Sequence, residues 1–132
     1  MIKKKIQYID FNGIEREDDF YFHLSLPEVT RLQAKYSPEA IDEYILRIAR
    51  EDDVEGVLRM MEDIILGAYG IKTVNGKSFI KTPEATKEFE YSEAYASLFE
   101  ELLTDPESLK KFAAGVGALN KTEVKPTMTV AE

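Results

Sequence analysis

The sequence predicts an α+β fold that is mainly α, in which an N-terminal antiparallel β-hairpin packs on a bundle of about five to six helices. Three observations predict it. Apolar residues alternate with polar ones on both sides of Asn12-Gly13, which is typical of a hairpin. Four of the five prolines stand in Pro-Glu pairs, a signal for helix starts. Residues 54–70 carry apolar residues at three- and four-residue steps, the spacing of a helix face.

The hairpin is expected from two strands, Lys4–Phe11 and Asp19–Leu24. Asn12-Gly13 tolerates the positive φ angles of a tight turn between them. Two strands alone are marginally stable in water, so one face of the hairpin must pack on helices.

The Pro-Glu pairs mark four helix starts, because proline lacks the N–H that has no partner in the first turn and glutamate favours the positive end of the helix dipole. The pairs are Pro27-Glu28, Pro38-Glu39, Pro83-Glu84 and Pro106-Glu107. Ser37, Thr82 and Asp105 stand where an N-cap acceptor belongs. The sequence therefore predicts helices from Pro27 to about Lys35, from Pro38 to about Glu51, briefly from Pro83, and from Pro106.

The central helix is expected over Val54–Gly70. Asp52 and Glu55 match a capping box at its start, and Gly70 is placed as a C-cap glycine at its end. Its apolar stripe consists of Val57, Leu58, Met61, Ile64, Ile65, Ala68 and Tyr69. Such a stripe is too wide for an isolated helix in water, so other elements must cover it.

The remaining segments complete the chain. Ile71–Lys81 contains a second Asn-Gly, at Asn75-Gly76, and is expected to be a small hairpin or an extended loop. In the Pro38 helix, the inward-facing residues are expected to be Ile41, Tyr44, Ile45 and Ile48. In a helix that begins near Ser92, they are expected to be Tyr95, Leu98, Phe99, Leu102 and Leu103. In the Pro106 helix, they are expected to be Leu109, Phe112, Ala113 and Val116. We expect one globular domain over residues 1–119, with the hairpin in residues 3–24 and the helical part in residues 27–119, followed by a disordered tail over residues 120–132.

Composition limits the function classes. A net charge of −8 argues against a nucleic-acid binder, which must neutralise phosphates with Lys and Arg, and suits a basic protein partner. The chain has no cysteine, hence no disulfide or thiolate nucleophile. The start of the sequence lacks the apolar run of a signal peptide, and no stretch approaches the ~18 apolar residues of a membrane helix. We therefore expect a cytosolic protein that does not bind membranes.

No pattern indicates a reactive site, and no catalytic residue, cofactor or metal ligand is predicted. His23 is the one histidine, too little for a dyad or a zinc site, and is expected to be a surface or half-buried packing residue. Gly76-Lys77-Ser78 resembles the end of a P-loop, but the spacing from Gly70 is wrong and Asn75-Gly76 is better explained as a turn. The acidic runs at Glu15–Asp19 and Glu51–Asp53 lack the alternating spacing and central glycine of a calcium loop.

Aromatic residues are concentrated between residues 69 and 99. Most are expected to fill the core, but aromatics are also enriched in interfaces, so some of them are candidates for a partner-binding surface. The candidates are Tyr69, Phe79, Phe89, Tyr91 and Tyr95.

The layout resembles a known family. The hairpin YIDFNGIEREDDFYFHLSLPEV is followed by AIDEYILRIARED, IILGAYGIKTVNGKSFIKTPE and FEYSEAYASLFEELLTDPESLKKF. In this order the segments are similar to the tail assembly chaperones of long-tailed bacteriophages and prophages of low-GC Gram-positive bacteria, over roughly residues 2–117. The most specific pieces are Asp10–Gly13, Phe20–Phe22 and Tyr69-Gly70 leading to Phe79–Lys81.

The resemblance implies a non-enzymatic function. Such chaperones bind the tape measure protein while the tail tube forms, with the tail tube protein as a further candidate partner, and are absent from the finished virion. Binding as a homo-oligomer, or as several copies on one target, would add multivalency. The alternatives are a small phage structural protein that stays in the particle and an adaptor that binds another protein.

Overall fold

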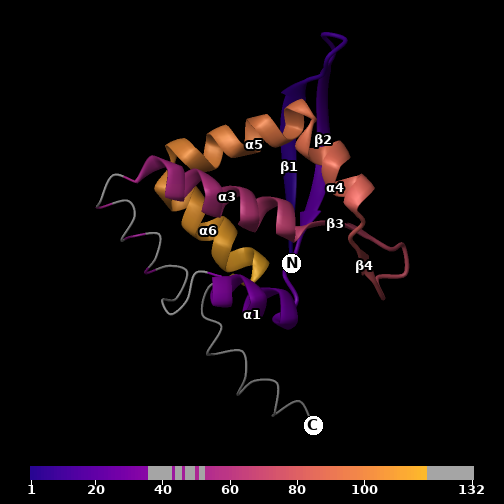
Figure 1. Cartoon of the computed structure of the whole chain (residues 1–132). Helices are drawn as coiled ribbons and strands as arrows, with labels where there is room; N and C mark the ends of the chain where they lie inside the picture. Colours follow the sequence, from indigo (N-terminus) through magenta and orange to yellow (C-terminus); the bar gives the residue numbers. More distant parts are fainter. Residues whose placement is uncertain (36–42, 44–45, 47–49, 51–52, 119–132) are drawn as a thin grey trace.

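The computed structural model describes residues 1–35, 43, 46, 50 and 53–118 (Figure 1). These residues form a four-stranded antiparallel sheet and a set of helices, which confirms the α+β, mainly α class with its N-terminal hairpin. The strands are β1 (Ile2–Ile9), β2 (Glu15–Phe22), β3 (Tyr69–Lys72) and β4 (Phe79–Ile80). The helices are α1 (Leu26–Lys35), α3 (Val54–Ala68), α4 (Pro83–Glu90), α5 (Glu93–Thr104) and α6 (Pro106–Val116).

The sheet is larger than the predicted hairpin. Its order is β1-β2-β3-β4, so the chain returns after α3 to extend the N-terminal hairpin. Strand β3 pairs with the end of β2 through Tyr21↔Gly70 and Phe22↔Tyr69, and β4 pairs with β3. From the sequence, Ile71–Lys81 could be a small hairpin or an extended loop, and the structure shows that it is a small hairpin.

Both Asn-Gly turns form as predicted. Gly13 and Gly76 have φ of +80° and +77°, a backbone conformation that glycine adopts without steric cost. Asn75 Oδ1 accepts hydrogen bonds from Thr73 Oγ1 (2.9 Å) and Lys77 N (3.0 Å), which fixes the second turn. Gly76 is thus a turn residue and not part of a phosphate-binding loop.

The helix caps confirm some predictions and correct others. Thr82 and Asp105 cap α4 and α6 as predicted, but α3 is capped by Asp53, whose Oδ1 accepts from Gly56 N at 3.0 Å. The sequence prediction had assigned this cap to Asp52. A capping box that the prediction missed lies at the start of α1: Glu28 N donates to Ser25 Oγ (3.4 Å) and Ser25 N donates to Glu28 Oε1 (2.8 Å).

Gly70 is not the C-cap of the central helix. Helix α3 ends at Ala68, Tyr69 leaves it in an extended conformation, and Gly70 lies inside β3. A Cβ at Gly70 would lie 2.5 Å from Cε2 of Phe79, so glycine is needed to admit this ring from the neighbouring strand. Gly70 lies in a strand because β3 pairs with β2, and a glycine at the end of a helical stripe gives no information about that pairing.

The core lies between the sheet and the helices, with α3 at its centre. Met60, Met61, Ile64, Ile65 and Ala68 are buried along α3, while the predicted stripe residues Val57 and Leu58 are half-buried. The predicted inward face of α6 is confirmed: Leu109, Phe112, Ala113 and Val116 are all buried. In α5, Leu98 and Leu102 are buried as predicted, but Leu103 is exposed because it lies next to the buried face and not on it.

Some predictions fall outside the described residues. They are the helix over Pro38–Glu51 for most of its length, the N-cap at Ser37, and the tail over residues 120–132. Among the described residues, no helix is both long enough and apolar enough to span a membrane.

Candidate partner-binding surfaces

Three of the five aromatic candidates, the buried Phe89 and the half-buried Tyr69 and Tyr95, meet in one cluster. The Tyr69 ring stacks on Phe89, with ring centroids 4.4 Å apart and an interplanar angle of 11°. Tyr95 meets the same Phe89 ring edge-on at 5.5 Å, and Phe22 contacts it from the sheet at 5.7 Å. Phe89 is only 3% exposed, so this cluster joins β2, β3, α4 and α5 as core.

The other two candidates lie elsewhere. Phe79 pairs with Lys72 in the sheet and covers Gly70, which puts it on the face opposite Tyr69, where it meets His23 edge-on at 6.1 Å. Tyr91 follows α4 and is 69% exposed. The structure therefore does not gather the five aromatics into one surface, and their role in partner binding stays a prediction.

His23 is half-buried, as predicted for a packing residue. Its Nδ1 is buried without a hydrogen-bond partner among the described atoms. Burial lowers the pKa of His23, and the positive charges of the N-terminus and Lys81 lower it further. The ring is therefore suited to packing as the neutral form.

Lys81 connects three segments that are far apart in the sequence. Its Nζ donates to the carbonyl oxygens of His23 and Gly67 and to Glu28 Oε1, each at 2.7 Å. The carbonyl of Gly67 belongs to the last turn of α3, where a cation also meets the negative end of the helix dipole. Because Glu28 belongs to the capping box of α1 and His23 directly follows β2, Lys81 fixes α1, α3 and the segment after β2 relative to one another.

A groove of about 460 Å³ lies between α3 and α4, next to Lys81. Leu66 and Pro83 contribute to its apolar floor, and Lys87 and Glu90 add charges of opposite sign. The groove is open, and its mixed charge favours no particular class of partner.

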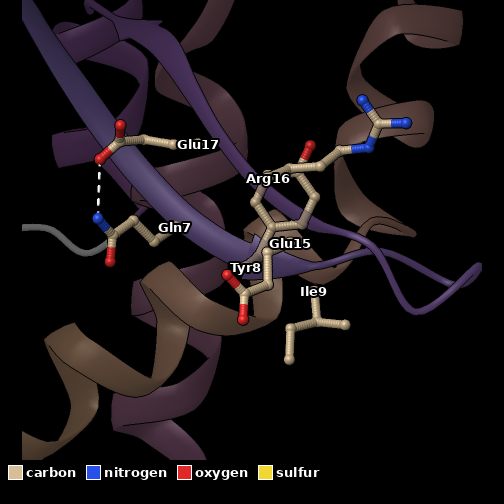
Figure 2. A pocket seen from close by; sticks show the side chains of 6 residues that line it. All are labelled: Gln7, Tyr8, Ile9, Glu15, Arg16 and Glu17. Atoms are coloured by element: carbon tan, nitrogen blue, oxygen red, sulfur yellow. Dashed lines mark hydrogen bonds between the residues drawn. The ribbon is translucent and has the colours of Figure 1, made fainter.

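A second hollow, of about 530 Å³, lies along the β1–β2 hairpin. Figure 2 shows that it is lined by side chains of both strands, with Gln7 donating to Glu17 Oε2 at 2.8 Å. Glu15 and Glu17 are both exposed, so the hollow does not provide the water-excluding surroundings on which acid–base catalysis relies. Among the described residues, no group of His, Cys, Asp and Glu is arranged to hold a metal ion.

The end of this hairpin exposes apolar side chains. Ile9, Phe11 and Ile14 are 57%, 76% and 53% exposed. From the sequence, Ile9 and Phe11 were predicted to lie in the strand Lys4–Phe11, with Asn12-Gly13 as the turn, and this exposed surface was not predicted. A signal was present, because residues beside an Asn-Gly turn are usually polar and here two of them are Phe11 and Ile14.

Comparison with protein families matches residues 1–117 to the model of a family described as phage tail assembly chaperone. The chain belongs to this family. The match spans the hairpin and all of the described helices, and it confirms the resemblance found in the sequence. The chain matches no curated protein and no solved structure.

Membership of this family indicates which kind of surface on the chain is relevant to its function. A phage tail assembly chaperone has protein partners in tail assembly. Protein-binding surfaces are therefore the relevant features of this fold. In this chaperone the apolar end of the hairpin and the α3–α4 groove are candidates for such surfaces.

Proposed function

We propose that this chain binds the tape measure protein transiently in the host cytoplasm while the tail tube assembles, and that it is not part of the mature virion. Membership of the phage tail assembly chaperone family over residues 1–117 is the observation that carries the proposal. The tail tube protein is a further proposed partner, and several copies of the chaperone, separate or as an oligomer, are proposed to bind one tape measure chain.

The properties of the tape measure protein determine what a chaperone for it must provide. A long helical protein exposes apolar stripes until the tube surrounds it, and these stripes aggregate unless something covers them. A chaperone for such a client needs exposed apolar side chains and enough net charge to keep the complex in solution. Exposed Ile9, Phe11, Ile14 and Tyr91, together with a net charge of −8, support this role.

Co-expression tests the proposal. The tape measure protein of the same phage or prophage genome is produced with and without this chain, and the soluble fraction is measured and then purified through a tag on the chaperone. We expect co-purification and a larger soluble fraction. Failure of the full-length protein and of every fragment to co-purify, at low and at moderate salt, would contradict the proposal.

Purified virions separate the transient role from the alternatives. Mass spectrometry of mature particles should find the tape measure protein and not this chain. Stoichiometric recovery of the chain from particles would instead identify a structural component. Recovery of a different protein in place of the tape measure protein, in the tagged purification, would identify an adaptor.

A further inference from the structure

We propose that the end of the β1–β2 hairpin, residues 8–18, is the element that docks on the tape measure protein, and that it binds a helical segment with basic residues beside an apolar stripe. The inference rests on the proposed function and adds to it a docking surface and the chemistry of the segment bound. We refer to residues 8–18 as the hairpin tip.

The first observation is the exposure of apolar side chains. Ile9, Phe11 and Ile14 lie within six residues of one another and are each more than half exposed. Figure 1 shows the hairpin extending beyond α5, so the described helices do not cover its end. Apolar side chains that are exposed on a projecting element are typical of a protein-binding site.

The second observation is that the turn is held in one conformation by its own side chains. The Asp10 carboxylate accepts hydrogen bonds from Asn12 N and Ile14 N, both at 2.9 Å, and from Arg16 Nε. The hydrogen bond from Arg16, together with that from Ile14 N, lowers the pKa of Asp10, so the carboxylate stays ionised at neutral pH. A turn that is ordered before it binds loses less conformational entropy on binding.

The third observation is the charge around the apolar side chains. The tip contains four acidic side chains, Asp10, Glu15, Glu17 and Asp18, and one basic side chain, Arg16, which is bonded to Asp10. Its surface is therefore negative, and Lys or Arg beside an apolar stripe would complement it. Tip-to-tip contact between two copies would bring these acidic groups together, so a second copy is the less favoured occupant.

Direct binding measurements test the docking surface. Overlapping fragments of the tape measure protein from the same genome are titrated with the wild-type chain and with the double variant Phe11→Ser/Ile14→Ser. The double variant should bind at least about tenfold more weakly, as expected when central apolar anchors are removed from an interface. Its urea midpoint should match that of the wild type because both side chains are exposed.

The second hairpin provides a matched control. Val74 is fully exposed in the β3–β4 turn, next to Asn75-Gly76, so Val74→Ser removes an apolar side chain from an equivalent place. This variant should bind like the wild type. Equal weakening by Val74→Ser would show that the effect is not specific to the hairpin tip.

Charge reversal tests whether the acidic hairpin tip is complementary to basic residues of the bound segment. Glu15→Lys should weaken binding and reduce the dependence of the binding affinity on salt between about 50 and about 300 mM. Glu100→Lys makes the same change in net charge at an exposed residue of α5, and it should change neither.

If a fragment binds and all tip variants bind it as tightly as the wild type does, the proposed docking surface is wrong while the proposed function stands. If no fragment binds the wild type, both the proposed docking surface and the proposed function are wrong. Self-association that is lost with Phe11→Ser/Ile14→Ser would make a second copy the occupant and overturn the inference.

Discussion

Replacing Lys81 with methionine should destabilise the protein through the loss of one side chain that connects three segments. Methionine keeps most of the apolar stem and removes the ammonium group, whose three hydrogen bonds reach Glu28, Gly67 and His23 at 2.7 Å each. Hydrogen bonds that involve a charged group contribute about 1.5–3 kcal/mol each when buried.

The expected magnitude is smaller than the sum of these contributions. Lys81 and Glu28 are 20% and 30% exposed, so water can replace part of what is lost. We expect the free energy of unfolding to fall by about 2–3 kcal/mol, which corresponds to a decrease of about 1 M in the urea midpoint with an unchanged slope. Circular dichroism during urea titration measures both quantities.

Lys77→Met is the matched control, because Lys77 carries the same charge in the exposed β3–β4 turn. This control should change the free energy of unfolding by no more than about 0.5 kcal/mol. Equal stability of the Lys81→Met and Lys77→Met variants would refute the conclusion that Lys81 holds α1, α3 and the segment after β2 together.

The same contact predicts a pH dependence. Burial alone would raise the pKa of Glu28, but hydrogen bonds from Lys81 and Ser25 outweigh it and the pKa is lowered. A lowered folded-state pKa contributes stability above the unfolded-state pKa of about 4.3, and this contribution is lost as the pH falls through the folded-state value. The stability difference between wild type and Lys81→Met should therefore be constant near neutral pH and shrink below about pH 4.

Three further substitutions test the fold. Tyr95→Phe should leave stability unchanged or raise it by up to about 1 kcal/mol, because the Tyr95 hydroxyl is buried with no partner among the described atoms. Burial raises the pKa of Tyr95 to about 12, so an alkaline absorbance titration of the variant should lack a tyrosine that ionises near pH 12 in the wild type. Gly70→Ala should cost about 1–3 kcal/mol because its Cβ would overlap the Phe79 ring, whereas Gly67→Ala, in a helix with room for the methyl group, should not destabilise; thermal unfolding compares the two. Ser25→Ala should cost about 1 kcal/mol through loss of the α1 capping box, and a urea midpoint equal to the wild type would show that this cap is dispensable.

The sequence by itself determined the local elements of this protein. Asn-Gly turns, Pro-Glu pairs with their caps, and apolar stripes act over a few residues, so their signals can be read wherever they occur. They placed the N-terminal hairpin, α1, α3 and the last three helices, and the order of these segments carried the resemblance to the family. The errors at Asp52 and Leu103 are shifts of one residue at a helix end and at the edge of a stripe.

The tertiary structure decided everything that depends on distant segments meeting. Pairing of β3 with β2 turned Gly70 from an expected helix cap into the strand glycine that admits Phe79. The same pairing helped to bury Phe89, which the sequence could equally have placed on a surface. Lys81 gained partners that are 14, 53 and 58 positions away, and the exposure of Phe11 depended on where the helices end beside the hairpin. Burial and non-local contacts are properties of the assembled packing, and no spacing along the chain contains them.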